Sequence, residues 1–153
     1  IDLGCGPGFF TLPMAELVGP TGRVFAVDLQ EEMLHIVRSK IPERRDQSMS
    51  LNIEFHQCSE HEIGLEENIE ADFILAYYMV HETQDHYRFF DQVRRLLKPG
   101  GTFLVVEPPF HVTQKTFITT LGLAERAGFV ILDRPKRKGG KSALLSTCPP
   151  GIP

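Results

Sequence analysis

Short apolar runs alternate with segments of helical periodicity along most of the chain, and this alternation limits the folds that it can adopt. The runs predict seven strands, at residues 1–3, 23–28, 52–56, 71–77, 102–107, 129–133 and 142–146. The centre of the run at residues 23–28 is wholly apolar, which is typical of a parallel strand buried on both faces. Strands that alternate with helices form a parallel sheet with helices on both faces.

The last predicted strand, at residues 142–146, is the exception, because no helix precedes it. Only the short basic segment 135–141 separates it from the strand at residues 129–133, so these two strands must pair antiparallel as a hairpin. We therefore predict an α/β protein with a Rossmann-like, doubly wound sheet of seven mostly parallel strands, an antiparallel last strand and helices on both faces.

The first predicted helix follows the first strand. Its residues Phe10, Met14, Leu17 and Val18 fall on one helical stripe, which we expect to be buried, and Gly19 ends the helix. The other helices are predicted at residues 30–39, 89–97 and 113–127.

The size and composition of the chain fit one globular domain. It has 153 residues, of which 42% are hydrophobic and 24% charged. We assign residues 1–147 to the domain, expect its first strand to begin before Ile1, and expect residues 148–153 to be a frayed tail. The longest apolar stretch, 73–80, is far shorter than the roughly 20 residues of a membrane-spanning helix. The net charge of −4 argues against nucleic acid as a partner.

The three cysteines, Cys5, Cys58 and Cys148, are odd in number and widely spaced. This pattern indicates neither a disulfide framework nor a zinc site with four cysteine ligands. Because cysteines without a disulfide pattern fit a reducing compartment, we expect a cytoplasmic protein.

The segment from Asp2 to Gly8 joins the first strand to the first helix and has glycine at positions 4, 6 and 8. Glycines permit a tight turn and the close approach of a ligand, and free amides at a helix start favour an anionic group. Doubly wound sheets bind their ligands at this edge, beyond the carboxyl ends of the strands. We therefore expect a ligand at this loop.

Asp28 ends the second strand, twenty residues after Gly8. At this spacing an acidic side chain can accept hydrogen bonds from both hydroxyls of a ribose. In the structural alternative the glycines only turn the chain and Asp28 caps the next helix. The dinucleotide fingerprint Gly-x-Gly-x-x-Gly is not matched, because Phe9 stands where its third glycine would be, and this disfavours NAD.

Two stretches of the sequence, IDLGCGPGFFTLPMAELVGPTGRVFAVDLQEEML and VRRLLKPGGTFLVVEP, resemble motifs of the class I S-adenosylmethionine-dependent methyltransferases. The resemblance is greatest to small-molecule enzymes similar to the ubiquinone and menaquinone biosynthesis methyltransferases. It implies S-adenosyl-L-methionine as cofactor and transfer of its methyl group to a small-molecule acceptor by in-line displacement. The acceptor, the methylated atom and the oligomeric state are left open.

The resemblance also implies which residues contact the cofactor. It places Asp2, Gly4, Cys5, Gly6 and Gly8 around the methionine part, Asp28 on the ribose, Leu29 and Met33 against the adenine, and Ala76 and Tyr77 with their backbone facing the methionine part. Cys58 stands where the family usually has an acidic acceptor for the adenine amino group. Because a thiol is a poor acceptor, adenine recognition can shift to Ser59, Glu60 or backbone groups, and Cys58 can equally be a small buried apolar residue.

A catalytic base is optional for methyl transfer, since positioning supplies much of the barrier reduction. If the acceptor must lose a proton, the candidate bases are His81, Glu82 and His111, and His81 ranks first. Glu107 and His111 follow the strand at residues 102–107 and can line the same cleft. A structural role for His81 is the alternative. A metal site built from His81, Glu82, Asp85 and His86 is disfavoured, because acidic residues at a helix start are explained by the helix dipole.

Two other functions remain open at this point. The first is a nicotinamide-dinucleotide oxidoreductase on a related fold. The second is a non-catalytic cofactor-binding module, suggested by Cys58 and by the lack of an obligatory catalytic residue.

Overall fold

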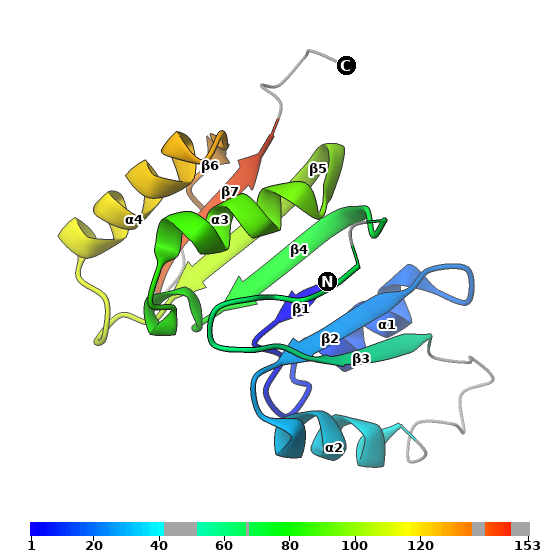
Figure 1. Cartoon of the computed structure of the whole chain (residues 1–153). Coiled ribbons are helices and arrows are strands. Elements are labelled where there is room, and N and C mark those ends of the chain that lie inside the picture. Colours follow the sequence, from blue (N-terminus) through cyan, green and yellow to red (C-terminus); the bar gives the residue numbers. More distant parts are fainter. Residues whose placement is uncertain (42–51, 67, 136–139, 148–153) are drawn as a thin grey trace. The chain divides into compact units, whose positions relative to one another are not determined.

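The computed structural model describes residues 1–41, 52–66, 68–135 and 140–147. They belong to two compact units, Ile1–Ser59 and Glu60–Pro153, which are described separately (Figure 1). The predicted tail at residues 148–153 and the centre of the basic segment, residues 136–139, lie outside the described residues.

The first unit is a small parallel β/α unit. Its elements are β1 (Asp2–Leu3), α1 (Thr11–Val18), β2 (Val24–Asp28), α2 (Glu31–Lys40) and β3 (Ile53–Gln57). The strands lie in the order β3-β2-β1, with Leu3 beside Val27 and Asp28 beside Gln57. Because all three are parallel, their carboxyl ends meet at one edge, where the glycine loop leaves β1.

The buried face of α1 differs from the predicted stripe. Thr11, Leu12 and Ala15 are the buried residues of this helix, whereas Leu17 is 86% exposed. Val18 is also exposed and Met14 only partly buried, so the prediction was wrong. Leu12 packs with Ala26 of β2 and with α2. The helix is apolar on more than one side, so periodicity alone could not tell its inner face from its outer one.

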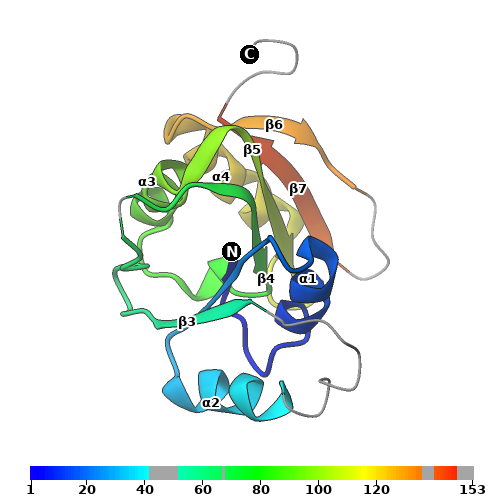
Figure 2. The same cartoon turned by 90° about the vertical axis from the view of Figure 1, so that its right-hand side faces the viewer.

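The second unit contains the remaining strands. Its elements are β4 (Ala71–Tyr77), the 3-10 helix η2 (Val80–Glu82), α3 (His86–Arg95), β5 (Leu97–Glu107), α4 (Gln114–Arg126), β6 (Val130–Asp133) and β7 (Lys141–Ser146). The strands lie in the order β4-β5-β7-β6 (Figure 2). β4 and β5 are parallel, and β7 is antiparallel to both of its neighbours.

All seven predicted strands are present, and the predicted fold class, a mostly parallel sheet with an antiparallel last strand, is confirmed. The predicted hairpin is also confirmed, with β7 inserted between β5 and β6. β5 begins at Leu97, earlier than predicted, because Leu97 pairs with Ala71. Gly101 allows this close approach, since a Cβ there would lie 2.8 Å from the carbonyl oxygen of Ala71.

Four aromatic rings form the centre of the second unit. Phe89 and Phe90 of α3 contact Phe103 of β5, and Phe129 completes the cluster. Neighbouring ring centroids lie 5.7 to 6.3 Å apart, the separation of favourable edge-to-face pairs. α3 and α4 lie side by side in both views (Figures 1 and 2).

Phe90→Ala should reduce the free energy of unfolding by about 3–5 kcal/mol, because Phe90 is fully buried and its removal leaves a cavity among three other rings. Urea denaturation measures the change. Phe110→Ala is the matched control, since Phe110 is 95% exposed and its loss should change stability by less than ~0.5 kcal/mol. Equal effects of the two substitutions would contradict this assignment of the core.

Candidate functional site

The glycine loop after β1 is held by backbone hydrogen bonds and by three glycines with positive φ. Gly4, Gly6 and Gly8 have φ values of 65°, 50° and 83°, in the region that favours glycine. The amide of Cys5 donates to the carbonyl of Val27 on β2 at 3.0 Å. Lys40, at the end of α2, donates to the carbonyl of Pro7 at 2.6 Å. The loop is thus tied to the strand and the helix that follow it.

Gly6 and Gly8 lack a side chain for different reasons. A Cβ on Gly8 would lie 2.9 Å from Cγ2 of Val37, so this glycine allows the loop to pack against α2. A Cβ on Gly6 would meet nothing within 4 Å, so the loop borders open space at that residue. Open space beside exposed backbone is what a ligand needs to approach the loop closely.

Asp28, at the carboxyl end of β2, binds the loop on one side and the start of α2 on the other. Its Oδ2 accepts from the amide of Gly6 at 2.8 Å, and its Oδ1 accepts from the amide of Gln30 at 2.9 Å. The bond to Gln30 is the one that the structural alternative requires. Each carboxylate oxygen has a second lone pair, so the side chain can still accept two further hydrogen bonds. We call Asp28 with the amides of Gly6 and Gln30 the Asp28 clamp.

Asp2 is a second buried carboxylate in the first unit. It is 2% exposed, and its Oδ2 accepts from the hydroxyl of Thr11 at 2.6 Å. Its pKa is raised from 3.8 to about 6, mainly by burial and to a smaller extent by the negative charge of Asp28, against the opposing effect of the Thr11 hydrogen bond. Asp2 is therefore ionised at neutral pH, but at a cost to the folded state.

The residues predicted to meet the adenine are only partly brought together. The apolar side chain of Leu29 is 46% exposed directly after the clamp, and Met33 is half-buried on α2. Cys58 follows β3, and its amide donates to the carbonyl of Asp28 at 3.0 Å. Burial raises the pKa of its thiol, as does the charge of Asp28, so the thiol stays neutral. Leu29 and Cys58 therefore both lie next to Asp28.

The remaining predicted cofactor residues divide between the two units. Cys5 is buried in the core of the first unit, where burial raises the pKa of its thiol to about 12, and Ser59 is exposed at the end of that unit. Glu60 is in the second unit, where it accepts from Gln84 at 3.2 Å. Ala76 is fully buried and Tyr77 half-buried at the end of β4.

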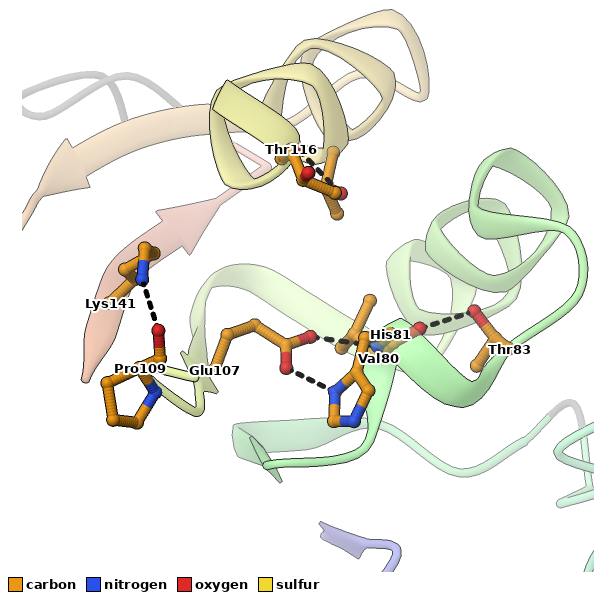
Figure 3. A network of polar contacts seen from close by, with 8 residues as sticks. Val80, His81, Thr83, Glu107, Pro109, Thr116 and Lys141 are labelled. Atoms are coloured by element: carbon orange, nitrogen blue, oxygen red, sulfur yellow. Dashed lines mark hydrogen bonds and ion pairs between the residues drawn. The ribbon is translucent and has the colours of Figure 1, made fainter. Parts of the chain in front are cut away.

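The two predicted base candidates lie in the second unit. His81 is in η2, and its Nδ1 lies 2.6 Å from Oε2 of Glu107, the last residue of β5 (Figure 3). The ring of His111 stacks on that of His81, with the centroids 6.1 Å apart. The structure therefore brings together His81, Glu107 and His111.

The arrangement around His81 does not match a metal site. His81 belongs to η2, whereas Asp85 precedes α3 and caps it by accepting from the amide of Arg88, so these residues do not share one helix face. Within the described part of the chain, no group of three or more His, Cys, Asp or Glu side chains could hold a metal ion.

Three contributors to the site were not predicted. Thr11 was not singled out, although it is fully buried and binds Asp2. The pairing of Glu107 with His81 was also missed, although an acidic residue that ends an apolar strand was the signal used for Asp28. Tyr78 has φ of 60° although it is not glycine, so the chain leaves β4 in a conformation that a bulky residue rarely adopts.

A separate cavity of about 670 Å³ lies in the second unit, between residues 62–65 and α3. Its charged side chains pair with each other, Arg88 with Glu62 at 2.7 Å and Arg95 with Asp91 at 2.5 Å. None of the predicted site residues lines it, and its charges are used within the protein, so it is not a candidate site.

Comparison with known proteins identifies the family. The methyltransferase domain model matches residues 1–105. The chain belongs to this methyltransferase family. It is 34% identical over 107 residues to the demethylmenaquinone methyltransferase of Lactococcus lactis, and 32% identical over 107 residues to the ubiquinone/menaquinone biosynthesis C-methyltransferase UbiE of Psychromonas ingrahamii. Each match covers 70% of this chain but only 40% and 41% of those proteins, so the chain spans less than half of their length.

The fold also matches solved structures. A crystal structure of a SAM-dependent methyltransferase from Aquifex aeolicus superposes with a TM-score of 0.81 at 23% identity, and covers 96% of this chain and 80% of that one. At this identity the match shows a shared fold. In the described part of this methyltransferase chain, each helix is too short or too polar to cross a bilayer.

Asp2→Asn should stabilise the protein at neutral pH. The pKa of Asp2 is higher in the folded state than its ordinary 3.8, so the folded state binds the proton more tightly and stability falls as the pH rises from 3.8 through about 6. Asparagine has no charge to desolvate and can keep a hydrogen bond to Thr11. The gain in the free energy of unfolding at pH 7.5 is at most roughly 3 kcal/mol, which corresponds to the difference between the pKa values of 3.8 and about 6.

Urea denaturation at pH 4.5 and pH 7.5 measures this gain. Asp72→Asn is the control with opposite sign, because Asp72 is exposed and a hydrogen bond from Lys98 lowers its pKa, so its replacement should not stabilise. An Asp2→Asn protein that is less stable than wild type at pH 7.5 would contradict the assigned cost of ionising Asp2.

Proposed function

We propose that the chain carries the cofactor-binding and catalytic residues of an S-adenosyl-L-methionine-dependent methyltransferase that acts on a small molecule. The observation that supports this most directly is the Asp28 clamp. The glycine loop, with open space beside Gly6, and an acidic residue ready to accept two further hydrogen bonds meet at the edge of one parallel sheet. The family match agrees with this reading. The domain is proposed to be residues 1–147.

The residues present fit the chemical parts of this cofactor. Asp28 would accept hydrogen bonds from the ribose hydroxyls, and the exposed apolar side chain of Leu29 would contact the adenine with Met33. Asp2, Gly4, Cys5, Gly6 and Gly8 would surround the methionine part, with further contacts proposed from Ala76 and Tyr77. When bound, the cofactor supplies an electrophilic methyl group on a sulfonium.

Adenine selection is proposed to rely on backbone groups near Cys58. The neutral thiol of Cys58 is a weak acceptor, so it contributes little to binding of the adenine amino group. Ser59 and Glu60, both exposed, are the neighbouring side chains proposed to take that role.

The acceptor is proposed to be a quinol-type small molecule. The support is the names of two relatives, a demethylmenaquinone methyltransferase and a ubiquinone/menaquinone biosynthesis C-methyltransferase. His81 is proposed as the base, with His111 as the second candidate. His81 is favoured because Glu107 holds its ring, whereas His111 is exposed and stacks on it.

The other sequence-based expectations remain proposals. A cytoplasmic location is supported by the free thiols of Cys5 and Cys58. The net charge of −4 supports a small molecule rather than nucleic acid as the partner. A nicotinamide oxidoreductase finds no support in the family match, and a non-catalytic module would leave the paired Glu107 and His81 without a role.

Asp28→Ala should weaken binding of S-adenosylhomocysteine roughly 30-fold or more, because hydrogen bonds to a charged group contribute ~1.5–3 kcal/mol each. Isothermal titration calorimetry of the purified protein measures the affinity, with NADH titrated in parallel. Asp72→Ala, an exposed carboxylate in the second unit, is the control and should bind like wild type. Unchanged affinity in Asp28→Ala would overturn the ribose assignment, and preferential binding of NADH would overturn the cofactor.

A further inference from the structure

Glu107 is a buried carboxylate whose two oxygens both bind one residue. It is 1% exposed at the end of β5. Its Oε1 accepts from the backbone amide of His81 at 2.9 Å, and its Oε2 lies 2.6 Å from Nδ1 of the same residue. Figure 3 shows the carboxylate between the backbone and the ring of His81. Both the position of His81 and the orientation of its ring are therefore fixed by one side chain.

These contacts also determine which ring nitrogen carries the proton. A carboxylate only accepts hydrogen bonds, so Nδ1 must be the donor to Oε2. In the neutral ring, Nε2 then keeps its lone pair and can accept a proton. The side chain of His81 is 25% exposed, so the ring is accessible from outside the protein.

A purely structural role does not require a carboxylate at this position. A glutamine could accept the amide hydrogen of His81 without the cost of a buried charge, and that burial raises the pKa of Glu107 despite the hydrogen bonds from His81 that lower it. Among the described residues, the other charged or titratable groups near the pair include Glu82 beside His81, His111 on its ring, and Lys141, which is opposite Glu107 on β7 and donates to the carbonyl of Pro109.

We infer that Glu107 is a positioning residue that holds His81 in the tautomer with Nε2 free, so that His81 can take the hydroxyl proton of the quinol-type acceptor proposed above. This inference rests on the proposed function. Nε2 of His81 takes the proton of the hydroxyl, and the electron pair of that bond makes the acceptor nucleophilic. The cofactor, held by the Asp28 clamp, would supply the methyl group and would keep the electron pair of the broken methyl–sulfur bond. The proton taken up makes His81 an imidazolium, whose positive charge Glu107 stabilises.

A phenol-type hydroxyl is the acceptor that gains most from such a base. A phenol ionises near pH 10, so at neutral pH only a small fraction is in the reactive anionic form. A base within hydrogen-bond reach of the hydroxyl removes its proton as the methyl group is transferred, so the acceptor need not ionise beforehand. An acceptor without a proton to lose would gain nothing from the tautomer that Glu107 enforces.

Glu107→Gln tests the inference because the side-chain amide of glutamine has one acceptor and one donor group, whereas both carboxylate oxygens are acceptors. The backbone amide of His81 needs an acceptor, which places the glutamine oxygen there and its NH₂ group toward Nδ1. Nδ1 must then accept, and the proton moves to Nε2, which can no longer act as a base. ¹⁵N NMR of the histidine rings in the unliganded protein should therefore show Nδ1–H for His81 in wild type and Nε2–H in Glu107→Gln. Nε2–H in wild type, or no change in the variant, would overturn the role of Glu107.

The second measurement is methyl transfer to 1,4-naphthohydroquinone under argon, between pH 6 and pH 9. In Glu107→Gln, kcat should fall about 100-fold at pH 6.5 with KM changed little, and the defect should shrink as the pH rises and the acceptor ionises without help. Glu107→Asp should recover part of the rate, and Glu70→Gln, an exposed carboxylate before β4, should match wild type. A defect of equal size at every pH would overturn the inference.

The outcomes separate this inference from the proposed function. If the wild-type protein does not bind S-adenosylhomocysteine, the proposed cofactor is contradicted. The NMR experiment would still decide the role of Glu107. Binding of S-adenosylhomocysteine without methyl transfer to the hydroquinone would contradict the quinol-type acceptor of the proposed function, and the NMR experiment would still decide the role of Glu107.

Discussion

The burial of carboxylates in or at the ends of short apolar strands is the constraint on which the candidate site depends. Among the described residues, the buried acidic side chains are Asp2, which begins β1, and Asp28 and Glu107, which end β2 and β5. A buried carboxylate is costly unless donors surround it. Each one has such donors: the hydroxyl of Thr11, the amides of Gly6 and Gln30, or the amide and ring of His81. In each unit, the loops next to these carboxylates are therefore fixed by groups that a ligand or a reaction can also use.

The sequence was most informative where local periodicity and strand context coincide. The strand positions and the hairpin of β6 and β7 follow from apolar runs and short connections, and the tight loop between β1 and α1 follows from its glycines. The face of α1 was mispredicted because its exposed positions, such as Leu17, are as apolar as its buried ones. The early start of β5 depends on pairing of Leu97 with Ala71, a contact between segments distant in sequence.

The same limit applies to the candidate base. His81 could be nominated from its place after β4, but its partner Glu107 lies 26 residues further along the chain. Only the fold shows that both oxygens of Glu107 bind His81, and only that geometry distinguishes a positioned base from an exposed histidine such as His111. The general lesson is that an acidic residue at the end of an otherwise apolar strand is worth testing for a partner.

The most direct test of the account is a crystal structure of the protein with S-adenosylhomocysteine. The account predicts that both ribose hydroxyls lie within about 2.6–3.2 Å of the Asp28 carboxylate, with the bonds of the Asp28 clamp to Gly6 and Gln30 retained. A ribose bound elsewhere, with Asp28 still making only its bonds to Gly6 and Gln30, would show that the clamp serves the loop alone and would contradict the proposed cofactor site.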